Sequence, residues 1–134
     1  MPLVHVTFLY AGLLGLLLVV LSFNMMKNWV RVTALGQQTN TDLRRAEALV
    51  ASFTDYVPIT LLLMGMLEAG GAPAAITHTL GCALVAARMM HAFGSNHLRG
   101  SGALRFFGAQ LTYLTLTITS FGCLYIYAIP KLIH

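Results

Sequence analysis

Charged and polar side chains interrupt one hydrophobic segment at helical spacing near residue 90. Arg88, His91 and Ser95 follow each other at i, i+3 and i+7. On an α-helix they would lie within about 60° of one another. Arginine binds carboxylates through paired hydrogen bonds, and imidazole and hydroxyl groups add further polar contacts. This face therefore favours an anionic ligand.

A second polar set lies on the segment before it. Ser52 and Tyr56 would lie within about 20° of Arg45 on a helix, and Asp55 about 80° away. A carboxylate inside a hydrophobic segment requires an explanation, because charge at membrane depth costs several kcal/mol. Asp55 either contacts the amine of a ligand or pairs with a basic residue on a neighbouring helix. The sequence leaves both interpretations open.

Two more polar stripes stand at the ends of hydrophobic runs. Near the C-terminus, four residues share a stripe about 80° wide: Arg105, Thr112, Thr115 and Thr119. We expect Thr115 and Thr119 to make interhelical hydrogen bonds. The first run ends with Asn24, Lys27, Asn28 and Arg31. Its two basic residues either meet a ligand or anchor the helix at the lipid head groups.

Composition identifies the elements that must position these side chains. The chain of 134 residues is 57% hydrophobic and 9% charged, whereas soluble domains carry about 25% charged residues. Its mean hydropathy is +0.76. A membrane-spanning helix needs about 20 apolar residues. The sequence therefore predicts an all-α integral membrane four-helix bundle, up-down-up-down, as one domain over residues 1–134. The predicted helices cover about 5–33, 43–69, 73–98 and 102–129.

The basic residues indicate the orientation of the bundle. The net charge is +4, but the basic residues lie at the edges of hydrophobic runs, which argues against nucleic acid as a partner. Seven of the eight lie in or beside the segments 27–47 and 88–105. The positive-inside rule places these segments in the cytoplasm and both termini outside it.

The histidines and cysteines do not predict a metal site. His78 and His91 are thirteen residues apart, or about 20 Å along one helix, so they cannot ligate one haem iron from one chain. Cys82 and Cys123 lie inside apolar runs and are expected to be buried, small hydrophobic residues.

Two segments resemble a known family. The first, 55–58, reads Asp-Tyr-Val-Pro and is followed by a Leu-rich run, and the second, 87–94, reads Ala-Arg-Met-Met-His-Ala-Phe-Gly. With the four expected helices and the polar first loop, they resemble the MAPEG family, the membrane-associated proteins in eicosanoid and glutathione metabolism. The family's second helix carries Arg, Asn and Glu where this sequence has Ala48, Ser52 and Asp55.

The resemblance implies a homotrimer in a bacterial inner membrane. Glutathione would bind as co-substrate between subunits near the cytoplasmic face, and a lipophilic electrophile or hydroperoxide would approach from the membrane lipid. Arg105 would stabilise the glutathione thiolate. The residues expected to bind glutathione are Lys27, Arg31, Arg45, Ser52, Asp55, Tyr56, Arg88 and His91.

The sequence supports three hypotheses about the function of the protein. The leading hypothesis is a glutathione transferase. The sequence leaves open whether the protein is also a peroxidase. The second is a non-catalytic MAPEG-like protein that binds lipid or has a structural role, which the residues at Ala48 and Ser52 favour. The third is a small four-helix transporter. Such transporters depend on an acid in the first helix, and the first run has no acidic residue up to Met26.

Overall fold

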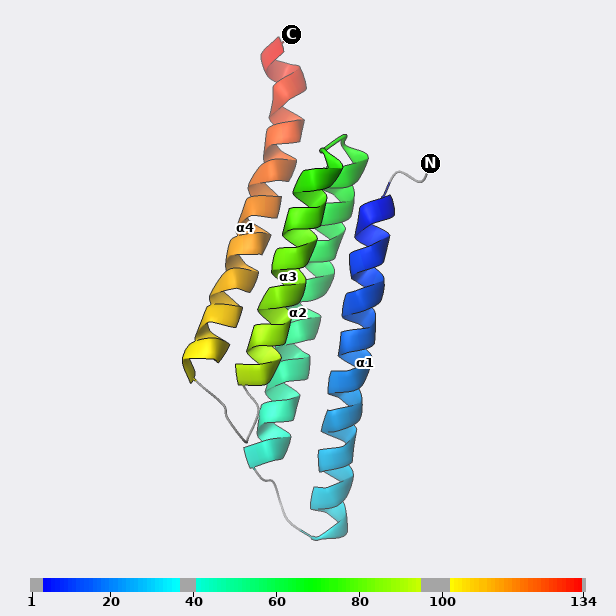
Figure 1. Cartoon of the computed structure of the whole chain (residues 1–134), viewed down its shortest axis with the longest axis vertical. Helices are drawn as coiled ribbons and strands as arrows, with labels where there is room; N and C mark the ends of the chain where they lie inside the picture. Colours follow the sequence, from blue (N-terminus) through cyan, green and yellow to red (C-terminus); the bar gives the residue numbers. More distant parts are fainter. Residues whose placement is uncertain (1–3, 37–40, 95–101, 134) are drawn as a thin grey trace.

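Four helices of alternating direction make up the described part of the chain. The computed structural model describes residues 4–36, 41–94 and 102–133. The helices are α1 (His5–Ala34), α2 (Thr41–Ala69), α3 (Ala74–Gly94) and α4 (Gly102–Ile133). They run up-down-up-down, so the end of α1, the start of α2, the end of α3 and the start of α4 all lie toward the lower end of Figure 1. The predicted all-α architecture is confirmed.

The two middle helices hold the bundle together. α3 contacts all three other helices and α2 does the same, whereas α1 and α4 do not touch each other. The core combines residues of α1, α2 and α3, and its most deeply buried members include Leu14, Met64 and Leu84. A polar residue on the inner face of α3 is therefore surrounded by protein and shielded from lipid.

Glycines allow α3 to approach its neighbours closely. A Cβ at Gly81 would overlap the ring of Tyr10 on α1. A Cβ at Gly108 of α4 would lie 2.6 Å from the His91 nitrogen and 2.8 Å from the Ala87 carbonyl oxygen. Small residues at such crossings let backbones approach within a membrane, where packing drives helix association.

The beginning of α1 is capped from another helix. Its own N-cap residue, Val4, makes no side-chain hydrogen bond. The Glu68 carboxylate on α2 instead accepts bonds from the Val6 and Thr7 amides, at 2.7 and 2.8 Å, and from the Thr7 hydroxyl at 2.7 Å. A carboxylate at this end also meets the positive end of the helix dipole. Glu68 thereby joins the end of α2 to the start of α1.

Three of the helices are long and apolar enough to span a bilayer by length and composition: α1, α2 and α4 as far as Ile129. α3 has 21 residues, about 32 Å, which is also sufficient in length. It carries Arg88 and two histidines, so it is less apolar than the others. The chain is an integral membrane protein.

The helix boundaries differ from the predicted ones by one or two residues at the end of α1 and the starts of α2 and α3, and by more at the ends of α3 and α4. α4 continues past residue 129, through Pro130, to Ile133. Proline has a helical φ but no backbone N–H, so α4 continues here without the hydrogen bond that residue 130 would donate to the carbonyl of residue 126. The end of the third helix was predicted at 98; α3 is described to Gly94, and Ser95 lies outside the described residues.

The threonines of α4 also differ from expectation. Thr112, Thr115 and Thr119 are buried, but each hydroxyl donates to the carbonyl four residues earlier on the same helix, at 3.0, 2.8 and 2.6 Å. The predicted interhelical bonds of Thr115 and Thr119 are therefore wrong. Back-bonding satisfies a hydroxyl locally and leaves its methyl group to pack against the neighbouring helix.

Candidate functional site

Arg88 is the most deeply buried basic residue among those the structure describes. Its side chain is 2% exposed. One guanidinium nitrogen, Nη1, donates to Ser52 Oγ at 3.3 Å. The guanidinium carbon lies 5.2 Å from the centre of the Phe53 ring, in a cation–π contact. Arg88 thus joins α3 to two consecutive residues of α2, and one of them is Ser52, which was also expected to bind the ligand.

His91 lies one turn further along α3, at the crossing with α4. It is 7% exposed, and its backbone packs against Gly108. Its Nδ1 has no hydrogen-bond partner in the described part of the chain. Arg88 precedes it by one turn on α3, and the Arg105 backbone of α4 packs against Gly94, one turn after His91. The structure thereby brings together three of the residues selected from the sequence.

Tyr56 pairs with a residue that the sequence analysis did not select. Its ring meets the Tyr113 ring of α4 edge to face, with centroids 5.2 Å apart and planes at 75°. Tyr113 lies off the polar stripe of α4, so helical periodicity gave no reason to choose it. Tyr113 could have been chosen on another ground, because it is an aromatic residue at the same membrane depth as Tyr56 on a different helix.

Five of the selected residues, Arg105 among them, lie on the outside of the single chain. Lys27, Arg31, Arg45, Asp55 and Arg105 are exposed. Asp55 is exposed and Ser52 is half-buried, although the two residues lie only about 60° apart around the helix. The bundle therefore does not enclose a complete ligand site from these residues.

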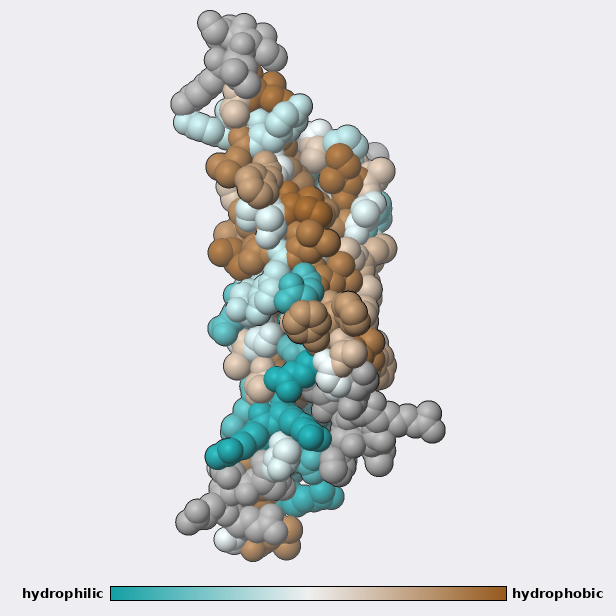
Figure 2. All heavy atoms as spheres, turned by 90° about the vertical axis from the view of Figure 1, so that its left-hand side faces the viewer, coloured by the Kyte–Doolittle hydropathy of each residue, from teal (hydrophilic) through white to brown (hydrophobic). Residues whose placement is uncertain are grey.

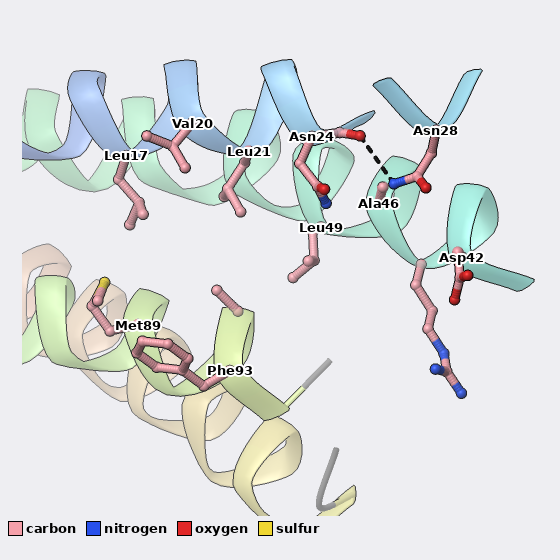
Figure 3. A pocket seen from close by; sticks show the side chains of 12 residues that line it. Leu17, Val20, Leu21, Asn24, Asn28, Asp42, Ala46, Leu49, Met89 and Phe93 are labelled. Carbon is pink, nitrogen blue, oxygen red and sulfur yellow. Dashed lines mark hydrogen bonds between the residues drawn. The ribbon is translucent and has the colours of Figure 1, made fainter. Parts of the chain in front are cut away.

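An open pocket of about 540 Å³ lies between α1, α2 and α3. Figure 3 shows its two ends: Leu17, Val20 and Leu21 lie along α1 at one end, and Asn24, Asn28 and Asp42 lie at the other. Met89 and Phe93 of α3 face the apolar row across the pocket. The Asn28 amide donates to the Asn24 carbonyl oxygen at 3.0 Å.

The polar end of this pocket also contains Arg45. Polarity changes along the helix axis, from leucines and valine toward amides and charges. Such a gradient suits a ligand with an apolar body and a polar group at the end where the helices α1 and α2 connect. The sequence predicted Arg45 for a site, but the spacing did not show that α3 would supply Met89 and Phe93 opposite α1.

The surface has the same polarity. In Figure 2 hydrophilic residues gather in the lower half of the molecule and hydrophobic residues dominate the upper half. Arg31 lies near the end of α1, Arg45 near the start of α2, Arg88 near the end of α3 and Arg105 near the start of α4. Alternating helix direction brings all four to this lower end.

Neither cysteine forms a disulfide, and their surroundings differ. Cys123 is half-buried on α4, and its thiol donates to the Leu63 carbonyl oxygen at 3.4 Å. Cys82 is exposed on α3, so the prediction that it is buried is wrong. An apolar run shows that a segment is hydrophobic, but it does not show which side of the helix faces the protein. The described residues contain no group of three or more histidine, cysteine or acidic side chains placed to hold a metal ion.

Fold and site together define a small multi-pass helical membrane protein whose basic side chains meet at one end of the bundle. The chain belongs to the MAPEG family, whose family model matches residues 7–125. It is 33% identical over 93 residues to the inner membrane protein YecN of Escherichia coli strain K12, covering 69% of this chain and 71% of that protein. The same values hold for the protein of that name in E. coli O6:H1. No solved structure matches the chain. The predicted localisation in a bacterial inner membrane is confirmed.

Proposed function

We propose that the protein is a membrane-bound glutathione transferase. Its reaction joins the glutathione thiolate to a lipophilic electrophile that arrives through the bilayer. Peroxidase activity on lipophilic hydroperoxides would use the same thiolate. Family membership supports glutathione as the co-substrate, and the basic end of the bundle supports a site for its two carboxylates.

The observation that carries the proposal is the gathering of basic side chains at the end of the bundle where Arg88 is buried. Arg88 is held by Ser52 and Phe53, beside His91. The exposed basic side chains of the other three helices reach the same end of the molecule. On the face shown in Figure 2, hydrophilic residues gather at this end and hydrophobic residues dominate the other half, so a water-borne anion entering the membrane interface meets favourable charge at this end.

The residues take different roles in this proposal. Lys27, Arg31 and Arg45 bind the carboxylates, and Asp55 binds the amine. Arg88 is buried and acts as a positioning residue for Ser52, next to Tyr56. Arg105 faces the thiolate. A free thiol has a pKa of about 8.5, and a nearby cation lowers it.

A homotrimer completes the site. Five of the selected residues are exposed on the single chain, and a ligand between neighbouring subunits would be surrounded by them. The pocket beside Arg45 gives a ligand with an apolar body a place at the same end of the bundle.

A non-catalytic lipid-binding role is the second candidate. Asp55 is exposed, and Ala48 stands where the family has arginine. The amphipathic pocket between α1, α2 and α3 also suits a membrane lipid. Under this function the protein would bind lipid and leave glutathione unreacted.

Purified protein in a mild detergent tests both functions. We expect conjugation of glutathione to an aromatic electrophile, followed by absorbance, at a rate that saturates with glutathione and is absent from heat-inactivated protein. Native mass spectrometry of the same sample should show three chains. No conjugation above the uncatalysed rate would overturn the transferase proposal, and a fully active monomer would overturn the intersubunit site.

A further inference from the structure

Three side chains of α1 and α3 form a hydrogen-bonded chain away from the basic end. The Tyr10 hydroxyl lies 3.0 Å from His78 Nδ1 and 3.1 Å from Cys82 Sγ. His78 and Cys82 are four residues apart and occupy the same side of α3. The phenol thus connects a thiol to an imidazole.

Tyr10 is held firmly in this position. Its side chain is 5% exposed, and its ring packs on Gly81, where any Cβ would overlap it. The ring also meets His78 edge to face, with centroids 5.7 Å apart. The missing side chain at position 81 therefore gives the phenol its place between the two helices.

Each direction of the hydrogen bonds has a use in a reaction of the thiol. When the thiol donates to the phenol and the phenol donates to Nδ1, a proton can pass from sulfur to the imidazole. When the phenol donates to sulfur, it stabilises negative charge there. A thiol becomes nucleophilic as the thiolate, and an adjacent base is the usual means of activation.

The thiol is also accessible. Cys82 and His78 are both exposed on α3. His78 is four residues from the start of α3 at Ala74, or about 6 Å along the axis. The cluster therefore lies toward the end of α3 opposite Arg88 and His91, where a compound dissolved in the bilayer can reach the sulfur.

We propose that Cys82 is a reactive thiol that adds covalently to lipophilic α,β-unsaturated carbonyl compounds. The sulfur forms a bond to the β-carbon, and the π electrons of the C=C bond move to give an enolate. The thiol proton passes through Tyr10 to His78 and returns to the α-carbon. Thiol and electrophile are the only reactants, so the reaction proceeds without glutathione.

The test compares the two cysteines of one molecule. Folded protein in detergent is treated with a long-chain 2-enal in the absence of glutathione, and peptide mass spectrometry follows the adducts at Cys82 and Cys123. We expect Tyr10→Phe, which keeps the ring and removes the hydroxyl, to slow addition at Cys82 about tenfold. His78→Asn should have a similar effect. Addition at Cys123 should keep its wild-type rate in both variants.

Tyr125→Phe is the matched control, because Tyr125 is an exposed tyrosine of α4 and should leave both rates unchanged. Circular dichroism establishes that each variant is folded. In SDS-unfolded protein the Cys82 rate should be the same with and without Tyr10→Phe. Equal Cys82 rates in folded wild type and both folded variants would overturn the proposal, since exposure alone would then explain the reactivity.

Discussion

Arg88 shows how one charged residue is accommodated within the bundle. A guanidinium in hydrocarbon costs several kcal/mol unless polar or aromatic groups replace water. Ser52 accepts one of its hydrogen bonds, and the face of Phe53 meets the charge. Both partners lie on α2, so this cation also fixes how α2 and α3 face each other. Removing it would affect folding as well as ligand binding.

A substitution at Arg105 should change the rate of catalysis without changing the fold. It is exposed at the start of α4, and its proposed charge acts on the thiolate more than on the neutral thiol. We expect Arg105→Ala to slow conjugation at neutral pH about tenfold, equivalent to roughly 1.4 kcal/mol. The variant's bound thiol has the higher pKa, so raising the pH restores part of the rate.

Two further variants define this effect. Arg105→Lys should keep some activity, because a point charge suffices. Arg44→Ala removes another exposed arginine at the same end and should leave the pH–rate profile unchanged. A wild-type rate and profile for Arg105→Ala would instead mean that Arg105 only anchors α4 at the head groups.

Two contacts between different helices fix the positions of the helices. Glu68 caps α1 from α2, and the Gly108 backbone meets the α3 backbone at His91. Each of these contacts forms only when its two helices are in register. A shift of either helix along its axis would leave the α1 amides uncapped or press α4 against α3.

Gly108→Ala tests the crossing of α3 and α4. The added Cβ would lie 2.6 Å from the His91 nitrogen, which is backbone and cannot rotate away. Overpacking of this kind destabilises by about 1–3 kcal/mol. We expect a lower midpoint of thermal unfolding, followed by circular dichroism in detergent.

Gly12→Ala supplies the comparison, because nothing lies within 4 Å of a Cβ at this position of α1. Alanine favours helix over glycine by up to about 1 kcal/mol, so the midpoint should stay the same or rise. If both variants had the same midpoint, the close approach at Gly108 would not limit the packing of α4.

At the scale of the whole molecule, charge gives the bundle a direction. Alternating helix directions bring the basic residues near the end of α1, the start of α2, the end of α3 and the start of α4 to one end of the bundle. The other end holds the start of α1, the α2–α3 turn at Gly71 and the end of α4. This asymmetry is the basis of the predicted orientation.

Reporter fusions check that orientation. We expect a fusion at Gly71 to report the outside of the cytoplasm and a fusion at Gln38, which lies outside the described residues, to report the cytoplasm. The positive-inside rule is the physical reason, since cytoplasmic loops retain lysine and arginine. The reverse pattern would place the proposed glutathione site on the wrong side for a cytoplasmic co-substrate.

The sequence by itself determined the class of the protein and its helices. Hydrophobic runs of more than 20 residues, with scarce charge, permit only membrane helices, because backbone polar groups must be satisfied internally. Its periodicity also put Arg88 and Ser52 on the polar faces of their own helices. These properties depend on neighbouring residues along one helix, so local patterns reveal them.

Only the tertiary structure decided which sides of the helices meet. Asp55 is exposed although it adjoins the polar face of α2, Cys82 is exposed within an apolar run, and Tyr113 joins Tyr56. Glu68 reaches α1 across 61 residues of sequence, and Tyr10 reaches Cys82 across 72. Helical periodicity gives the angle of a side chain around its own axis. The rotation of each helix against its neighbours depends on close packing at positions such as Gly81 and Gly108. Periodicity along one helix does not reveal this rotation.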